Sequence, residues 1–178
     1  MSRSKALLLA VLLCAAVALG ATAAPARSGG QSAKQLFSLN RQVASAINAF
    51  RRAHGLARLR VSRGLNASTR QHSVEMGTDG YFDHPSADGT AFWKRIQGYY
   101  PKSNYSYWTV GENLLWSSPT VSAAAALQLW ARSPEHRRNL LDPNWRNLGV
   151  SSVHVIDAGG VYGGTTVTII TTDFGARH

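Results

Sequence analysis

The chain has 178 residues and a formal net charge of +10 at pH 7, from 19 basic and 9 acidic side chains. That length is enough for one domain with a sizeable hydrophobic core. The basic residues are scattered, as at Arg41, Arg58 and Arg146, and belong to no recognisable nucleic-acid module. The composition therefore argues against a specific nucleic-acid partner and favours anionic surfaces such as cell-envelope polymers or lipid head groups.

The first 26 residues have the order of a secretory signal peptide. Arg3 and Lys5 precede an apolar run over residues 6–19, and small residues follow it as far as Ala26. The run is too short for a comfortable membrane span, so a signal anchor is the less favoured alternative. We expect cleavage here, a secreted extracellular protein that is not an integral membrane protein after processing, and loss of the only cysteine, Cys14. The mature chain would then contain no disulfide.

A short leader and one domain follow. Residues 27–36 are rich in Gly, Ser and Gln, which predicts a disordered leader before a domain over residues 37–178. The domain opens with apolar residues at spacings of four, four and three, which predicts an amphipathic helix: Leu39, Val43, Ile47 and Phe50. We expect His54-Gly55 to end this helix, because glycine suits the position just after a helix.

Two more helices are predicted before residue 100. Ser62 can cap the first of them, and Gly77 is expected to end it. Its inner face should hold Leu65, Thr69, His72 and Met76. Thr90 can cap a second, shorter helix that carries Phe92, Trp93 and Ile96.

The next part of the chain alternates between loop, strand and helix. A polar and aromatic loop over residues 101–107 leads to a short strand or extended stretch over residues 108–116. Ser118-Pro119 should open an Ala-rich helix that ends near Trp130, since proline is favourable at the first helical position. Ser133-Pro134 repeats this arrangement and opens a short turn.

The C-terminal part changes to a strand composition. Residues 149–156 and 161–174 are rich in Val, Ile and Thr, with Asp157-Ala158-Gly159-Gly160 between them. This pattern predicts a β-hairpin. Helices first and strands last favour an α+β layered domain.

Four side chains are candidates for a functional site: His84, Glu112, Glu135 and His136. Taken singly, each has an ordinary structural explanation. His84 could be a turn residue, Glu112 a cap or salt-bridge carboxylate, and Glu135 a helix first-turn acid that suits the helix dipole. Taken together, two imidazoles and two carboxylates are enough for a metal or acid/base centre.

The segments around these residues, in their order, resemble the CAP superfamily, which includes cysteine-rich secretory proteins, antigen 5 and plant pathogenesis-related proteins. The likeness is closest to its disulfide-free bacterial members and covers roughly residues 39–175. The landmarks that carry it are Phe82-Asp83-His84, Gly111-Glu112-Asn113-Leu114, Trp130, Ser133 to Arg137 and Leu148-Gly149-Val150.

The resemblance implies an α+β fold, a three-layer α-β-α sandwich with a central groove that can hold a divalent metal, usually zinc. His84 and His136 match the family's two histidines, and Glu112 matches its first acid. The only nearby acid for the second place is Glu135, which is adjacent to His136. Neighbouring residues on a helix point about 100° apart, so we rank Glu135 below the other three.

Two functions remain open for such a chain. A catalytic zinc normally has three protein ligands, so two imidazoles predict a weak Zn²⁺ site with Glu112 supporting a ligating imidazole. We favour a secreted, monomeric binding module for a lipid, a peptide or an anionic cell-envelope ligand, as the family resemblance implies. The alternative is a metal-dependent, peptidase-like extracellular hydrolase with Glu112 as its base. A third interpretation treats the cluster as a purely structural polar network.

Overall fold

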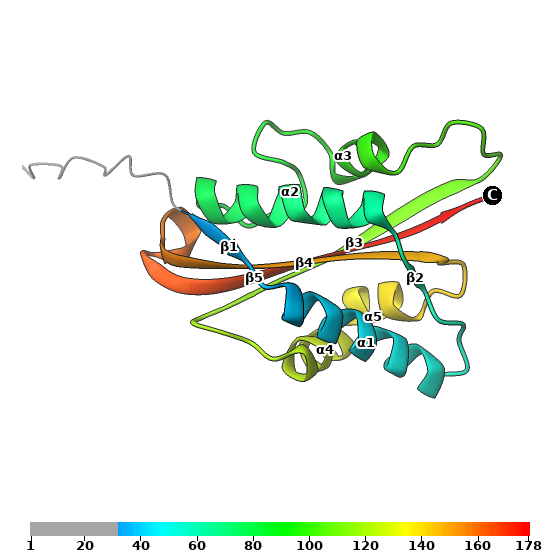
Figure 1. Cartoon of the computed structure of the whole chain (residues 1–178), viewed down its shortest axis with the longest axis horizontal. Helices are drawn as coiled ribbons and strands as arrows, with labels where there is room; N and C mark the ends of the chain where they lie inside the picture. Colours follow the sequence, from blue (N-terminus) through cyan, green and yellow to red (C-terminus); the bar gives the residue numbers. More distant parts are fainter. Residues whose placement is uncertain (1–31) are drawn as a thin grey trace, which may run out of the picture.

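Residues 32–178 are described by the computed structural model, and they form a sheet with helices on both faces (Figure 1). The strand order is β1-β4-β5-β3, with β1 Ala33–Gln35, β3 Trp108–Ser117, β4 Asn147–Ala158 and β5 Thr165–Arg177. Neighbours on this path are antiparallel, whereas the short β2, Arg60–Val61, runs parallel to β4. Strand β3 therefore lies at one edge of the sheet.

The helices form the two outer layers. One face of the sheet is covered by α2 (Arg63–Asp79) and α3 (Phe92–Tyr99), and the other by α1 (Phe37–Ala53), α4 (Ala123–Arg132) and α5 (Pro134–Leu141) (Figure 1). The predicted α+β, three-layer α-β-α sandwich is confirmed. No helix within residues 32–178 is long and apolar enough to cross a bilayer.

The strands separate two apolar clusters because successive side chains point to opposite faces. On β5, Val167 and Ile169 pack with Met76 of α2, whereas Ile170 and Phe174 pack with Trp130 of α4 on the other side. Asp173 lies between residues of these runs, on the α2 face, and is fully buried. An acid at a core position of a central strand needs a specific explanation, which the site provides.

The predicted inner face of α2 is confirmed. Leu65, Thr69, His72 and Met76 are all fully buried, and the Ser62 hydroxyl accepts a hydrogen bond from the Leu65 amide. The expectation that Gly77 ends the helix is wrong. The helix continues to Asp79, and Gly80, at φ +72°, is its C-cap. Gly77 serves packing instead, since a Cβ there would lie 2.7 Å from Val155 Cγ2.

Two predicted helix starts are also wrong. The N-cap of α3 is Ala91, while the Thr90 amide donates to Asp88 in the preceding turn. Helix α4 begins at Ala123 rather than near Pro119, because Ser122 supplies the capping oxygen for the Ala125 amide. The Pro119 carbonyl accepts from Thr168 Oγ1, so this residue is held against β5.

Amino-acid composition alone did not predict the structure at the start of the domain, whereas the strand pattern at its end did. The predicted signal peptide, residues 1–26, lies outside the described residues, as does the leader up to residue 31. The last residues of that expected leader form β1 instead, because the free edge of β4 pairs with them, and the Leu36 amide donates to the Ser152 carbonyl at 2.9 Å. The C-terminal hairpin is confirmed, although β5 begins at Thr165, after a 3-10 turn at Gly160–Tyr162.

Candidate binding groove

A hollow of about 390 Å³ lies against the edge strand β3, and all four predicted site residues line it. We refer to it as the β3 groove. His84 comes from the loop after α2, Glu112 from β3 itself, and Glu135 and His136 from the first turn of α5. Its other lining residues are Phe92, Val110, Gly111, Asn113, Arg138 and Asn139. Segments far apart in the sequence thus meet at one site.

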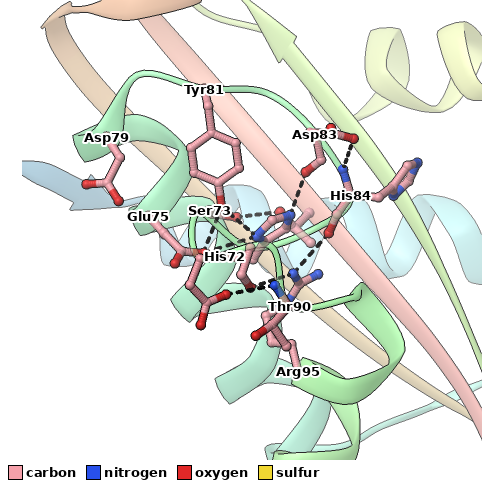
Figure 2. A network of polar contacts seen from close by, with 12 residues as sticks. His72, Ser73, Glu75, Asp79, Tyr81, Asp83, His84, Thr90 and Arg95 are labelled. Atoms are coloured by element: carbon pink, nitrogen blue, oxygen red, sulfur yellow. Dashed lines mark hydrogen bonds and ion pairs between the residues drawn. The ribbon is translucent and has the colours of Figure 1, made fainter.

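The His84 imidazole is oriented by Glu112. His84 Nδ1 lies 2.8 Å from Glu112 Oε1, and because a carboxylate only accepts, Nδ1 carries the hydrogen. The other ring nitrogen, Nε2, is left for a ligand, and the side chain is 46% exposed. Figure 2 shows the ring pointing away from the network behind it. The hydrogen bond to Glu112 raises the pKa of His84, with burial opposing it.

Glu112 is held in turn by Arg95. The Arg95 Nη2 donates to Glu112 Oε2, and both side chains are almost completely buried. Arg95 Nη1 also donates to the His84 carbonyl at 3.0 Å and to Ser86 Oγ at 3.1 Å. One guanidinium therefore fixes both the carboxylate and the backbone of the loop that carries His84, so the imidazole is positioned from two directions.

His72 extends this network beneath the loop (Figure 2). Its Nε2 donates to the Asp83 carbonyl at 2.9 Å and lies 4.0 Å from Glu112 Oε1. Its Nδ1 faces the Tyr81 hydroxyl, which donates to Glu75 at 2.7 Å. Burial is the main cause that lowers the pKa of His72. We therefore describe His72 as a neutral, structural histidine.

Asp173 is the deepest acid of the cluster. It lies directly opposite Glu112 in the β3–β5 ladder, and neither of its carboxyl oxygens has a hydrogen-bond partner within standard distance and angle limits. Burial raises the pKa of Asp173 well above its usual range, and the charge of Glu112 raises it further. Both effects favour the neutral form of Asp173, because two adjacent buried carboxylates that share one guanidinium would repel each other.

Two asparagines attach α5, which forms one wall of the groove, to β3. Asn139 Nδ2 of α5 donates to the Glu112 carbonyl at 3.0 Å and to Asn113 Oδ1 at 2.8 Å. Asn113 Nδ2 donates to the His136 carbonyl at 3.1 Å. These bonds fix the first turn of α5 beside the strand. Alternation along β3 thus sends Glu112 to the His84 side and Asn113 to the His136 side.

The two predicted α5 residues both reach the groove. His136 is half-buried, and burial lowers its pKa, with the nearby charge of His84 as the next cause. Glu135 is exposed and lines the same hollow, although the two residues are adjacent in the chain. Among residues 32–178, no three His, Cys, Asp or Glu side chains are arranged to hold a metal ion. The donor set therefore fits no closed zinc site and leaves the two imidazoles as candidate ligands.

Three buried members of the network were missed as site residues by the sequence reasoning: His72, Arg95 and Asp173. His72 was placed on the inner face of its helix and Arg95 was counted among the scattered basic residues. Asp173 is the one that a signal could have found, because it is an acid within a run of Val, Ile and Thr that is typical of a buried strand.

Residues 44–168 match the cysteine-rich secretory protein family, CAP, and the chain belongs to that family. The Bacillus subtilis protein YkwD is 29% identical over 133 residues, which are 75% of this chain and 49% of that protein. The chain thus spans about half the length of this curated relative. The B. subtilis membrane protein YlbC is 28% identical over 110 residues, 62% of this chain and 30% of its own length.

Solved structures agree with the fold. An extracellular protein from Bacillus anthracis that contains an SCP domain has a TM-score of 0.60 and 28% identity, over 78% of this chain and 40% of that one. An outer surface protein from Borrelia burgdorferi has a TM-score of 0.66 over 83% of this chain and 100% of its own. At 17% identity, the latter likeness concerns the fold alone.

Proposed function

We propose that this chain is a secreted binding module whose β3 groove takes a polar, peptide-like ligand of the cell envelope. The observation that carries the proposal is the preorganised His84, whose ring is fixed by Glu112 while Glu112 is fixed by Arg95. A side chain held in place before the ligand arrives loses little entropy on binding.

The walls of the groove favour a peptide over an acyl chain. Only Phe92 and Val110 among its lining side chains are apolar. Glu112 and the two asparagines are already bonded within the protein, which leaves His84 Nε2, Glu135, His136 and Arg138 to offer hydrogen bonds to a ligand. Pockets for drug-sized ligands are usually lined mainly by apolar side chains, with a few polar groups for specificity. A lipid tail would leave most of these polar groups without partners, which is costly.

The same geometry makes Glu112 a poor catalytic base. Its side chain is 1% exposed, and its two oxygens are occupied by His84 and Arg95. A general base must come within hydrogen-bond reach of the proton that it removes. If this groove does hydrolyse a peptide, Glu135 is better placed than Glu112, because it is exposed on the hollow beside His136. Hydrolysis remains the second candidate function on that observation.

A divalent metal is a supporting element of the proposal rather than its basis. His84 through Nε2 and His136 would hold Zn²⁺, with water or the ligand at the other positions, and a bound ion would supply a Lewis acid that attracts an anionic or carbonyl group of the ligand. Glu112 would act behind His84 by fixing its tautomer, as carboxylates commonly do for ligating histidines.

Export is also proposed, from the charged, apolar and small-residue order of residues 1–26 and the extracellular B. anthracis relative. N-terminal sequencing of the protein from culture supernatant tests it. We expect the mature chain to begin between Ala24 and Arg27. A membrane-bound product that retains residues 1–23 would contradict export.

A panel of labelled peptides separates binding from hydrolysis. Purified mature protein is incubated with the panel, with zinc or with a chelator, and both fluorescence anisotropy and product masses are recorded. We expect saturable anisotropy with intact peptides, lost in His84→Ala and retained in His54→Ala, whose imidazole lies outside the groove. Cleaved peptides would favour the hydrolase, and binding of long-chain fatty acids but of no peptide would contradict the proposed ligand class.

A further inference from the structure

A second hollow, of about 670 Å³, is lined by four arginines: Arg58, Arg60, Arg146 and Arg177. Ala57, Asn147 and His178 complete its lining, and it shares no residue with the β3 groove. We call it the arginine hollow. It lies at the end of the sheet where β2, the start of β4 and the end of β5 come together (Figure 1).

Backbone pairing places these arginines side by side. The Arg60 amide donates to the Arg146 carbonyl at 3.0 Å, and the Arg146 amide donates to the Gly175 carbonyl at 3.0 Å. Arg177 follows two residues later on the same strand as Gly175. Strands β2 and β5 therefore contribute Arg60 and Arg177, the residue just before β4 contributes Arg146, and the loop before β2 contributes Arg58.

Two of the guanidinium groups are already oriented. Arg177 lies over the Tyr100 ring, 3.9 Å from its centroid, and near the Tyr105 ring, while its Nη1 donates to the Pro101 carbonyl at 2.9 Å. Arg146 Nη1 donates to the carbonyls of Pro143, Asn144 and Trp145. Each of these guanidinium groups donates to the protein through Nη1, so its other N–H groups remain available to a ligand.

No acidic side chain offsets the positive charge of the arginine hollow among residues 32–178. No Asp or Glu lines it, and none of its arginines forms an ion pair with a carboxylate in residues 32–178. Arg58 and Arg60 make no side-chain hydrogen bond with that part of the chain and are exposed. Like charges gathered without counter-charges repel one another, and a concave basic surface concentrates anions.

We propose that the arginine hollow binds a phosphate group, as a phosphomonoester or phosphodiester. Guanidinium forks match the tetrahedral oxyanion through paired, charge-assisted hydrogen bonds. The phosphate can come from a soluble molecule or from a lipid head group. The site uses no residue of the β3 groove, so it stands or fails independently of the function proposed above.

Inorganic pyrophosphate is the soluble probe. Binding to the mature protein is followed by isothermal titration calorimetry and by NMR shifts of the arginine side chains. We expect Arg60→Gln and Arg58→Gln to weaken binding about tenfold each, the loss expected for one charge-assisted hydrogen bond. Arg70→Gln, an exposed arginine on the outer side of α2, removes the same charge elsewhere and should leave binding unchanged. Circular dichroism melts verify that all three variants fold.

Vesicles test the lipid source. Co-sedimentation with phosphatidylcholine vesicles is compared with and without phosphatidylglycerol. Binding of pyrophosphate, lost in the two hollow variants, supports a soluble phosphate. Binding only to phosphatidylglycerol vesicles, lost in the same variants, supports a head group. Equal losses in Arg70→Gln would show a general effect of net charge and overturn the site, as would the absence of binding to both probes.

Discussion

Glu112 and Asp173 lie directly opposite each other on β3 and β5, and both carboxyl groups are buried. Arg95 supplies one positive charge to this pair through Glu112. Burial and the charge of Glu112 raise the pKa of Asp173 well above its usual range, which favours the neutral form of Asp173. Glu112 is the acid that pairs with Arg95 and orients His84.

Asp173→Asn should stabilise the protein at neutral pH, by about 1 kcal/mol or more, because an amide needs no proton uptake to stay neutral. The pKa of Asp173 is raised in the folded state, so the wild type is at no disadvantage below the unfolded pKa, near 4. Its stability relative to the variant falls as the pH rises from there toward the folded pKa. Urea denaturation between pH 4 and pH 8 measures this divergence.

The exposed Asp79→Asn is the control for that series, and its curve should run parallel to the wild type. If the stability difference between Asp173→Asn and the wild type did not change between pH 4 and pH 8, the pKa of Asp173 would not be raised in the folded protein, which would contradict this account.

Arg95→Gln should destabilise the fold by about 3–5 kcal/mol, because it leaves the buried Glu112 carboxylate without its counter-charge. Adding Glu112→Gln should restore part of the loss, since the uncompensated charge is then removed. Chemical denaturation of both single variants and the double variant gives the coupling energy. Arg138→Gln, on an exposed arginine of the groove, should change stability by no more than about 0.5 kcal/mol. Additive losses would contradict a direct Arg95–Glu112 pair.

Much of this scaffold follows from local sequence signals. The apolar spacing from Leu39 to Phe50, the Ser62 cap and the Val, Ile and Thr content of the tail predicted α1, α2 and the hairpin. Each of these elements depends on contacts within itself or on the spacing of its own apolar residues. The start of α4 failed because two serines could cap it, and Ser122 does so while Pro119 is held against Thr168. The start of α3 failed because Thr90 belongs to the preceding turn, where its amide donates to Asp88.

The sequence pointed to residues that line the groove, but not to the buried residues that hold them in place. His84, Glu112, Glu135 and His136 do meet in one hollow, and the family resemblance selected them. Arg95 and Asp173 could not be selected, because their roles depend on strand register and helix docking. Whether Asp173 faces Glu112 or Asn113 is a matter of one residue of register, and a single sequence leaves that open.

Glu112→Gln should lower the pKa of His84, because the hydrogen bond to Glu112 is the main cause of its rise. The stabilisation from this pair is fully present below the unfolded pKa of histidine, about 6.5, and is lost as the pH rises through the higher folded pKa. Two-dimensional NMR of the imidazole resonances follows His84 and His136 separately. A His84 pKa that does not change in the variant would mean that the two side chains do not meet in solution.

The most direct test of the groove is a calorimetric zinc titration of the wild type, His84→Ala, His136→Ala, Glu112→Gln and Glu135→Ala, with His54→Ala as the control. We predict a micromolar or weaker site that is abolished in both histidine variants, weakened about 10–100-fold in Glu112→Gln and least affected in Glu135→Ala. Binding should fade as the pH drops through the raised pKa of His84, because protons compete for the imidazole. Unchanged zinc binding in His84→Ala, or an equal loss in His54→Ala, would contradict the assignment of the zinc site to this groove.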